Sequence, residues 1–511
     1  MNETSDATEA VDDATDASGP ATVADGPYGS NASERTQREA LTGGDVPVAV
    51  YGLGKMGLPL AAVYADTTGN VTGVDVDPSV VETVEDGGCH VVGEPGLADL
   101  VAEQVDRGRL EATTDGVDAA SRASIHVVIV PTLIDDDGSP NLTTVESVID
   151  DIAAGLAPGD LVIAESTLPP GSCRDVLAPH LEAESGLEVG EFGLAFCPER
   201  TSSGTALRDI RGRYPKVVGG IDDESSRAAA LVYDKLSSNE IRVVSDATTA
   251  EAVKVFEGVY RDVNIALANE LGTLADELGI SVREAFETAN DLPMCQLHDP
   301  GPGVGGHCIP YYPHFLLDWL ETELPLTRRA RTVNEGMPAL TVDRLERALE
   351  DAGEDADLSE ANVVVLGVTY RPGVAETRAS PAVGVIEALA DRGATVHAVD
   401  PLVDPAEYGA RPLEVDDLPE RSTDFDAAVV VTPHEEFDRI AWADLDPMIV
   451  VDGRDAFEAA LEGTDHRRYT LGGTGGGRPP TESSAPEADS ADGTTPEAPR
   501  STARRTDGGD R

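Results

Sequence analysis

Apolar and polar positions alternate in blocks along most of this 511-residue chain. Short runs of Val, Ile, Leu and Ala have the length of buried strands, and between them apolar residues recur at helical spacing. The strand-like runs are 46–51, 126–132, 161–167 and 192–200, and later 361–373, 393–401, 427–433 and 448–454. Strands that alternate with helices predict a parallel sheet covered by helices on both faces.

The strand pattern stops between about 246 and 345. Within that stretch, 249–279 carries apolar residues at helical spacing and contains no proline. We therefore expect an α/β protein in three parts: an N-terminal Rossmann domain over 45–245, a helical region over 246–345, and a C-terminal Rossmann-like domain over 358–470.

Both ends of the chain differ from this core. Residues 1–44 are mainly Asp, Glu, Ala, Thr, Ser and Gly, and residues 472–511 add Pro to a similar composition. Such segments have little apolar surface to bury, so we expect two disordered tails.

The charge balance is strongly acidic. Asp and Glu number 95 against 37 Lys and Arg, which gives a net charge of -58, and only four of the basic residues are lysines. Acidic excess of this kind suits very high salt, where screening weakens repulsion, so we expect a halophilic organism. A phosphate backbone would be repelled, and we expect no nucleic-acid partner.

The cysteines point to a reducing compartment. There are five, with no CxxC pair, at Cys89, Cys173, Cys197, Cys295 and Cys308. An odd, scattered set argues against a disulfide framework and against a zinc ribbon, so we expect no metal and a cytoplasmic location. No apolar stretch approaches the roughly 18 residues of a membrane span, and we expect no membrane contact.

A glycine-rich turn follows the first strand-like run. Gly52, Gly54 and Gly57 form a GxGxxG sequence between a strand and a helix, and Asp75 ends the next strand. Glycines at these positions let a pyrophosphate approach the helix N-terminus, and the carboxylate suits ribose hydroxyls. Because Asp75 would repel a 2′-phosphate, the pattern predicts NAD rather than NADP.

One cysteine lies in an unusual loop. The sequence GPGVGGHCIPYYP, residues 301–313, places Cys308 among glycines and prolines that cannot form a helix or a central strand. A thiol beside an NAD domain suits oxidation of an aldehyde to an acid. A thiolate adds to the carbonyl, and the adduct then releases a hydride and becomes a hydrolysable thioester.

These motifs resemble, in order, those of the UDP-glucose/GDP-mannose dehydrogenase family, whose enzymes oxidise C6 of a nucleotide sugar to a uronate with two NAD. The resemblance covers about 45–470 and rests on GLGKMGLPLA, GEPGLADLV, VPT, AESTLPPGS, GPGVGGHCIP and YRPGVAETRASP. FCPER, YRDVNIALANEL and GHCIP are most similar to the UDP-N-acetyl-D-mannosamine dehydrogenases. The UDP-N-acetylglucosamine and UDP-glucose 6-dehydrogenases remain alternatives.

The resemblance implies an NAD-binding domain, a helical dimerisation region and a UDP-sugar-binding domain, and hence a homodimer. Matched motifs imply that Cys308 is the nucleophile, that Lys254 polarises O6, and that Glu199 activates water. The implied cofactor contacts are Gly52, Gly54, Lys55, Met56, Gly57, Asp75, Thr132 and Thr167, with Thr132 also counted as catalytic. The implied substrate contacts are Arg200, Lys254, Arg261, Gly305, His307, Arg371 and Arg378. A protonated His307 would also lower the pKa of Cys308.

Two positions depart from the family pattern. The family usually has Asp four residues after the nucleophile and Asn four residues after the lysine, whereas this chain has Tyr312 and Gly258. Glycine inside a helix is unfavourable by roughly 1 kcal/mol, so we expect Tyr312 to fill the space that Gly258 leaves.

Two further functions stay open on the residues alone. A two-electron hydroxy-acid dehydrogenase would share the NAD fold and need no thiol. A degenerate member would bind a nucleotide sugar without turning it over, although the presence of Lys254, Cys308 and Glu199 together argues against that.

Overall fold

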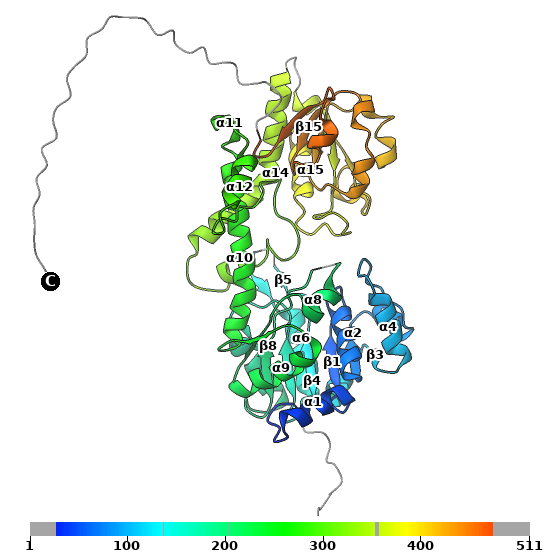
Figure 1. Cartoon of the computed structure of the whole chain (residues 1–511), viewed down its shortest axis with the longest axis vertical. Coiled ribbons are helices and arrows are strands. Elements are labelled where there is room, and N and C mark those ends of the chain that lie inside the picture. Colours follow the sequence, from blue (N-terminus) through cyan, green and yellow to red (C-terminus); the bar gives the residue numbers. More distant parts are fainter. Residues whose placement is uncertain (1–26, 136, 203, 353–356, 474–511) are drawn as a thin grey trace, which may run out of the picture.

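The computed structural model describes residues 27–135, 137–202, 204–352 and 357–473. Two β-sheets lie toward opposite ends of the molecule, the long helix α10 (Ala247–Gly272) runs from one toward the other, and α14 (Pro325–Ala352) packs along it (Figure 1). The predicted order of an α/β part, a helical part and a second α/β part is confirmed.

The first sheet has eight strands in the order β10-β9-β8-β7-β4-β1-β2-β3. They are β1 (Val48–Tyr51), β2 (Val71–Val74), β3 (Leu110–Thr113), β4 (Ile125–Val128), β7 (Leu161–Ala164), β8 (Gly193–Phe196), β9 (Lys216–Gly220) and β10 (Ile241–Val243). All neighbouring pairs are parallel except β8–β9. The winding of the sheet reverses between β1 and β4, and doubly wound folds bind ligands at such a point, beyond the carboxyl ends of the strands.

Helices cover both faces of this sheet. They are α1 (Glu34–Gly43), α2 (Gly57–Thr68), α3 (Pro78–Glu85), α4 (Leu97–Asp106), α5 (Gly116–Arg122), α6 (Thr143–Gly155), the π-helical turn η1 (Cys173–Leu177), α7 (Ala178–Ser185), α8 (Ala206–Gly212) and α9 (Asp223–Leu236). A short hairpin is formed by β5 (Leu133–Ile134) and β6 (Pro140–Asn141).

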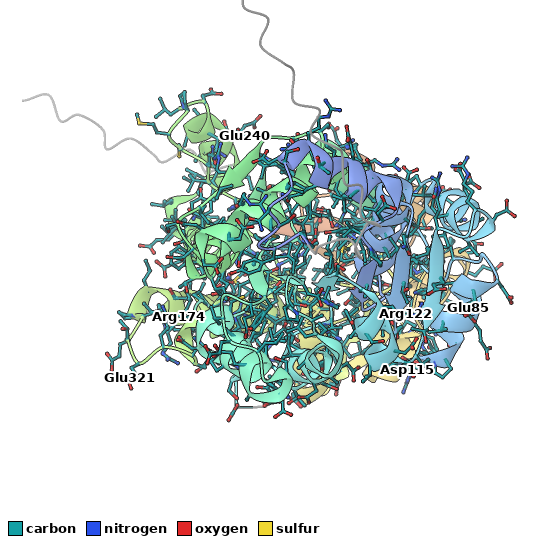
Figure 2. All side chains as sticks on the ribbon, turned by 90° about the horizontal axis from the view of Figure 1, so that it is seen from below. Glu85, Asp115, Arg122, Arg174, Glu240 and Glu321 are labelled. Atoms are coloured by element: carbon teal, nitrogen blue, oxygen red, sulfur yellow. The ribbon has the colours of Figure 1, made fainter. Side chains whose placement is uncertain are left out.

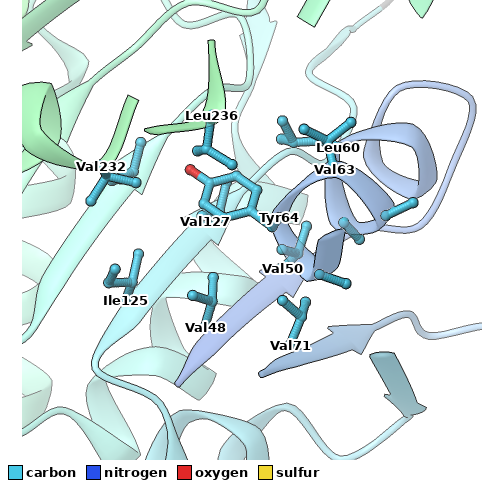
Figure 3. Packing of buried hydrophobic residues seen from close by; sticks show 14 of the residues in the cluster. Val48, Val50, Leu60, Val63, Tyr64, Val71, Ile125, Val127, Val232 and Leu236 are labelled. Carbon is cyan, nitrogen blue, oxygen red and sulfur yellow. The ribbon is translucent and has the colours of Figure 1, made fainter. Parts of the chain in front are cut away.

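Successive side chains along each strand point to opposite faces of the sheet, and each face packs against its own hydrophobic core. On one face, Val48 and Val50 of β1 pack with Tyr64 of α2 and Val232 of α9, all fully buried (Figure 3). Their neighbour Tyr51 belongs to the core on the opposite face. A parallel sheet that is buried on both faces explains why its strands read as near-continuous apolar runs.

The N-terminal segment differs from the predicted disorder of 1–44, because part of it folds. Helix α1 begins after Ser33, whose hydroxyl accepts a hydrogen bond from the Thr36 amide at 3.2 Å. Leu41 is fully buried, and Arg227 of α9 donates to the carbonyl of Pro27 at 3.0 Å. The sequence did not predict this helix because its composition is polar and few of its side chains are apolar and buried. The rest of the predicted tails, 1–26 and 474–511, lies outside the described residues.

The helical part consists of α10, α11 (Ala275–Leu278), α12 (Val282–Asn290), α13 (His314–Leu317) and α14. A buried ion pair joins the two long helices: Arg331 Nη1 of α14 lies 2.7 Å from Asp262 Oδ1 of α10. Asn334 Nδ2 donates to the same carboxylate oxygen at 2.8 Å. These contacts hold α10 and α14 in a fixed register.

The second sheet is six-stranded, parallel throughout, in the order β13-β12-β11-β14-β15-β16. Its strands are β11 (Asn362–Leu366), β12 (Thr395–Val399), β13 (Arg411–Pro412), β14 (Ala427–Val430), β15 (Ile449–Asp452) and β16 (Arg467–Thr470). Its helices are α15 (Pro381–Asp391), α16 (Glu458–Leu461) and the 3-10 turns η2 (Leu358–Glu360), η3 (Pro405–Tyr408), η4 (Val415–Asp417), η5 (Ser422–Asp424), η6 (Glu435–Arg439) and η7 (Trp442–Asp444).

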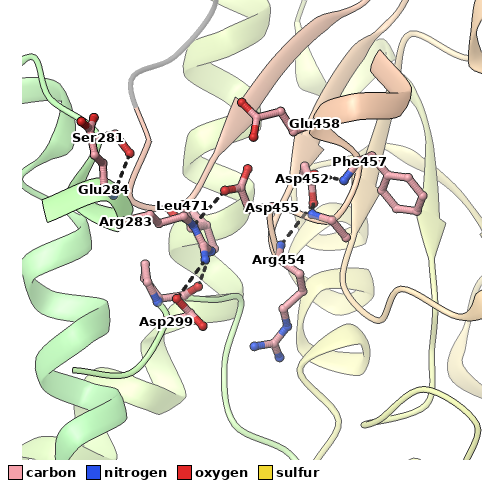
Figure 4. Close-up of polar contacts among 12 residues, drawn as sticks. Ser281, Arg283, Glu284, Asp299, Asp452, Arg454, Asp455, Phe457, Glu458 and Leu471 are labelled. Atoms are coloured by element: carbon pink, nitrogen blue, oxygen red, sulfur yellow. Dashed lines mark hydrogen bonds and ion pairs between the residues drawn. The ribbon is translucent and has the colours of Figure 1, made fainter. Parts of the chain in front are cut away.

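Polar contacts fix this second α/β part to the helices. Arg283 of α12 donates to the carbonyl of Leu471 at 3.1 Å, and it lies 3.8 Å from Asp455 and 3.6 Å from Asp299 (Figure 4). Within the described ranges, no helix combines the length and the hydrophobicity that crossing a bilayer requires.

Candidate active site

The glycine-rich turn lies between β1 and the start of α2. Gly52 has a φ of 96°, and a side chain there would approach the Ile129 carbonyl to 2.7 Å. A side chain at Gly57 would lie 1.8 Å from the Gly52 carbonyl, whereas Gly54 has nothing within 4 Å. The outer two glycines therefore allow the turn to close, and the middle one leaves the backbone open to a ligand.

The surroundings of this turn suit a dinucleotide. Helix α2 begins without a side-chain cap, so the positive end of its dipole faces the turn and suits an anion. Asp75 Oδ2 accepts a hydrogen bond from the Leu53 amide at 2.8 Å, which fixes the carboxylate beside the turn. Two of the predicted cofactor contacts are directed elsewhere: Met56 Sδ accepts from the Thr201 hydroxyl at 3.1 Å, and Lys55 Nζ lies 3.3 Å from Glu376.

The two predicted threonines follow neighbouring strands. Thr132 comes after β4, and its Oγ1 is buried without a hydrogen-bond partner among the described residues. Thr167 comes after β7, and its Oγ1 lies 3.4 Å from the Tyr312 hydroxyl. An orphaned buried hydroxyl beside an open glycine turn fits the head of a bound nicotinamide dinucleotide or a water.

Lys254 and Glu199 lie against one another where α10 passes the end of β8. Lys254 is buried, and its Nζ donates to the Glu199 carbonyl and lies 3.8 Å from Glu199 Oε2. The other carboxylate oxygen of Glu199 accepts from the Thr201 amide. A lysine and a glutamate that lie 55 positions apart in the sequence are thus brought into contact.

Cys308 is solvent-accessible and faces the same region. The surrounding protein displaces water from the thiol, which raises its pKa, but hydrogen bonds with His307 and Tyr312 and the charges of His307 and Lys254 outweigh this effect. The net result is a pKa below the ordinary value, as the sequence predicts for a nucleophile next to a protonated histidine.

The loop around Cys308 needs glycine for close packing. A side chain at Gly305 would lie 2.7 Å from Cβ of Tyr370, and Gly306, at a φ of 91°, lies under the Tyr370 ring. The Gly306 amide donates to the Arg378 carbonyl at 2.8 Å. The loop that carries the predicted nucleophile, residues 301–313, therefore packs against the segment that follows β11.

The two departures from the family pattern lie face to face. A side chain added at Gly258 would approach Cδ2 of Tyr312 to 2.0 Å, so the tyrosine ring occupies the space that glycine leaves on α10, as predicted. Tyr312 is largely buried and packs with Val255, Phe315 and Leu316. Burial raises the pKa of its phenol well above the ordinary value, and the nearby Cys308 raises it further.

The predicted arginines are not gathered at one point. Arg200 donates to Glu257 at 2.8 Å and to the Pro215 carbonyl, and Arg261 is exposed on α10. Arg371 and Arg378 are exposed on the segment after β11, and among the described residues neither guanidinium has an ion pair. Only the latter two lie on the segment that borders the nucleophile loop.

Three further residues shape this region, and the sequence reasoning missed two of them, Arg454 and Glu376. Arg454, in VVDGR after β15, follows Asp452 (Figure 4). Its guanidinium donates to the Gly303 carbonyl at 3.3 Å, and burial lowers its pKa to about 10. Asn269 of α10 accepts from the Gly301 amide at 2.9 Å. Glu376 pairs with His307. The polar sequence after a buried strand was the available signal for Arg454 and Glu376.

The chain belongs to the UDP-glucose/GDP-mannose dehydrogenase family. It matches the family's NAD-binding domain over 46–237, its central domain over 248–336 and its UDP-binding domain over 364–459. The fold is therefore an N-terminal NAD-binding Rossmann domain, a central helical domain and a C-terminal UDP-binding domain, as the sequence predicts.

Named relatives cover most of the chain. It is 36% identical over 412 residues to a UDP-N-acetyl-D-mannosamine dehydrogenase from Pyrococcus horikoshii, covering 80% of this chain and 95% of the relative. It is 32% identical over 424 residues to an NDP-N-acetyl-D-galactosaminuronic acid dehydrogenase from Ralstonia nicotianae, covering 81% and 96%. The solved structure of a UDP-D-ManNAc dehydrogenase from P. horikoshii superposes with a TM-score of 0.76 at 33% identity, covering 84% of this chain and 99% of that one.

Proposed function

We propose that this protein oxidises C6 of UDP-N-acetyl-D-mannosamine to the carboxylate of UDP-N-acetyl-D-mannosaminuronate, with two NAD as acceptors. The observation that carries the chemistry is the convergence of Cys308, Lys254 and Glu199 beyond the carboxyl ends of β4, β7 and β8. The sugar assignment is supported by the 36% identical relative that bears the mannosamine name.

The cofactor-binding role goes to Gly52, Gly54, Gly57 and Asp75. The open backbone at Gly54 and the uncapped start of α2 support this assignment. NAD, when bound, accepts one hydride in each of the two oxidations. Thr132 and Thr167 would border its reacting end, whereas Lys55 and Met56 contribute through the backbone of the turn.

Lys254 is assigned to the oxygen on C6. Its ammonium group would hydrogen-bond O6 and stabilise negative charge there, while the neighbouring Glu199 carboxylate takes the alcohol proton and C6 loses a hydride to NAD. The same group would then stabilise the oxyanion that forms when the aldehyde is attacked. Its burial beside the Glu199 carbonyl supports a fixed geometry for both steps.

Cys308 is assigned to the second oxidation. Its thiolate would add to the aldehyde carbon, forming a C–S bond and a thiohemiacetal, which becomes a thioester when a hydride leaves C6. Water would then attack the thioester while Glu199 takes a proton from that water, and the C–S bond breaks to release the carboxylate and the thiol. The lowered pKa of Cys308 supports attack at neutral pH.

The remaining assignments concern substrate and subunits. Segments 45–245, 246–345 and 358–470 would serve cofactor binding, dimerisation and UDP-sugar binding. Arg371 and Arg378 suit a diphosphate because their guanidinium groups are exposed beside the nucleophile loop. We assign weaker substrate contacts to Arg200, Arg261, Gly305 and His307.

Dimerisation is supported by apolar side chains that the single chain leaves in solvent. They gather on α10, on α11 and in the turn that follows α12: Phe256, Tyr260, Leu267, Leu278, Leu292 and Met294. Exposed apolar surface of this kind usually marks an interface. All five cysteines are free, which supports a reducing, cytoplasmic location.

The test is a stoichiometric assay of the purified protein in molar KCl. UDP-N-acetylmannosamine should give the highest kcat/KM in a panel with UDP-N-acetylglucosamine, UDP-N-acetylgalactosamine and UDP-glucose, with about two NADH for each uronate. Cys308→Ser should lose most turnover and still bind NAD. One NADH per sugar with an aldehyde product would exclude the four-electron route, and preference for another sugar would replace the substrate assignment.

A further inference from the structure

Glu376 connects two regions of the molecule that sequence keeps far apart. It lies on the segment after β11, and its two carboxylate oxygens have different partners. Oε1 lies 3.1 Å from Nδ1 of His307 in the nucleophile loop, and Oε2 lies 3.3 Å from Nζ of Lys55 in the glycine-rich turn. Its side chain is 20% exposed, against 41% for His307 and 50% for Lys55, so the carboxylate is the most enclosed member of the three.

His307 in turn lies between Glu376 and Cys308. His307 directly precedes Cys308 in the chain, and its Nδ1 lies 3.1 Å from Glu376 Oε1. The thiol and the carboxylate both favour the imidazolium and raise the pKa of His307 to about 10. The hydrogen bond from His307 is also the largest cause that lowers the pKa of Glu376 to about 2, with the Lys55 charge adding to it. A carboxylate, an imidazolium and a thiol thus form one line of contacts.

None of the other ionisable groups described near His307 and Cys308 could pair with His307 in place of Glu376. Lys254 on α10 and Tyr312 in the same loop also act on the thiol, and both lower the pKa of Cys308. Tyr370 and Arg371 lie on the segment that carries Glu376, and Glu199 is paired with Lys254 on the far side of the site. Glu376 is the carboxylate within ion-pair distance of His307 among the described residues.

We propose that Glu376 is a positioning residue: its carboxylate holds His307 against Cys308, and its second oxygen makes this arrangement depend on contact with the cofactor-binding turn at Lys55. The nucleophile would then be fully activated only when the NAD-binding and UDP-binding domains lie together. This inference rests on the proposed role of Cys308 as the nucleophile and adds the residue that prepares it.

The experiment measures the reactivity of Cys308 without substrate. The full-length protein in molar KCl is treated with iodoacetamide from pH 5 to pH 11, and alkylation of Cys308 is followed by mass spectrometry of its peptide, with Cys295 as internal reference. Glu376→Gln should slow alkylation at pH 7 by about tenfold, shift the midpoint of the pH profile upward, and leave the plateau at high pH unchanged. Glu376→Asp should restore part of the rate.

Four further variants distinguish a positioning role of Glu376 from general damage to the fold. His307→Gln should cause an equal or larger shift, and adding Glu376→Gln to it should change nothing further, because both act through one contact. Lys55→Gln should shift the midpoint less than Glu376→Gln does. Glu435→Gln, an exposed carboxylate of the same domain, should match the wild type.

Each outcome bears on the inference. An unchanged midpoint in Glu376→Gln would overturn it, and so would a loss that is equal at every pH, since that indicates a displaced loop rather than a lost charge contact. If the midpoint shifts but the wild type forms only one NADH per sugar, the positioning role stands and the four-electron function fails.

Discussion

At the scale of single residues, the candidate active site combines a buried lysine with a tyrosine–glycine contact. Tyr312 and Gly258 stand where the family usually has an aspartate and an asparagine. Lys254 lies against Glu199, while the Tyr312 ring covers Gly258 and its hydroxyl lies 3.4 Å from Thr167. Burial keeps the phenol protonated, because it raises the pKa of Tyr312 well above its ordinary value. Tyr312 is therefore a poor base at neutral pH, which supports the proposed assignment of proton transfer to Lys254 and Glu199.

This division of roles predicts unequal effects of two substitutions. Tyr312→Phe should keep kcat/KM within roughly tenfold, about 1.4 kcal/mol of barrier, because it removes one hydrogen bond and keeps the packing. Lys254→Ala should lose about a hundredfold or more, the usual scale for an acid–base group. Steady-state kinetics with NAD titrations on both variants would check this, and equal losses would show that the tyrosine has replaced the family's aspartate in function.

Several site residues were accessible from sequence because their motifs are local. Cys308, Lys254, Glu199 and the glycine turn each stand in a short stretch whose composition signals its chemistry. Glu376 and Arg454 were missed because their partners lie far away in the chain and only the docking of the second α/β part brings them together. The side-chain directions of Lys55 and Met56 depend on the same docking.

At the scale of elements, α10 is fastened to the segment before η1 by a buried carboxylate. Glu251 of α10 accepts hydrogen bonds from the Gly171 amide at 2.5 Å and the Cys173 amide at 2.8 Å. Burial outweighs these bonds and raises the pKa of Glu251 to about 7. This contact holds the helix that carries Lys254 against the loop that carries Thr167.

The raised pKa predicts a pH-dependent stability. The folded protein binds this proton more tightly than the unfolded chain, so the contribution is present below about pH 4.5 and is lost as pH rises through about 7. The loss should be on the order of 3 kcal/mol. Urea unfolding between pH 5 and pH 8 should show a flatter pH dependence for Glu251→Gln, which cannot titrate.

The same substitution should lower stability at pH 5, because an amide offers one acceptor oxygen to two backbone donors, at about 1–3 kcal/mol. Glu270→Gln, an exposed position on the same helix, is the matched control and should leave the pH dependence unchanged. A wild type whose unfolding free energy does not vary across this range would contradict the assignment.

Most strands that are buried on both faces of a sheet were predicted correctly from the sequence. Several elements with few buried side chains were not predicted. The central strands of both sheets are near-continuous apolar runs, so their positions could be read from the sequence. The edge strands β3, β10, β13 and β16 are partly exposed and were not predicted. Helix α1 was missed because its only buried residue is Leu41, and docking on α9 stabilises it. Composition alone cannot distinguish such a helix from a tail.

At the scale of the whole molecule, charge dominates the surface. Charged side chains such as Glu85, Asp115, Glu240 and Glu321 stand at the outline in Figure 2. With 95 acidic and 37 basic residues, neighbouring carboxylates repel one another unless ions screen them. We propose that the fold is adapted to high salt.

Melting temperature should therefore rise with KCl concentration. Screening shortens the Debye length to about 3 Å at 1 M, so repulsion between the 58 excess negative charges weakens and unfolding becomes less favourable. Differential scanning calorimetry from dilute buffer to molar KCl would measure this. The same melting temperature at both extremes would contradict salt adaptation, and an equal rise in sucrose would point to solute exclusion rather than screening.

The contact between Gly258 and Tyr312 also limits how this chain can exchange segments with its relatives. One position lies in the middle of α10 and the other beyond the nucleophile, 54 positions later, yet any side chain at 258 meets the tyrosine ring. A chimera that takes an asparagine-bearing helix from a typical family member while keeping Tyr312 would collide at this point. A working chimera must therefore take α10 and the loop with Tyr312 from the same parent. We also expect positions 258 and 312 to covary among homologues.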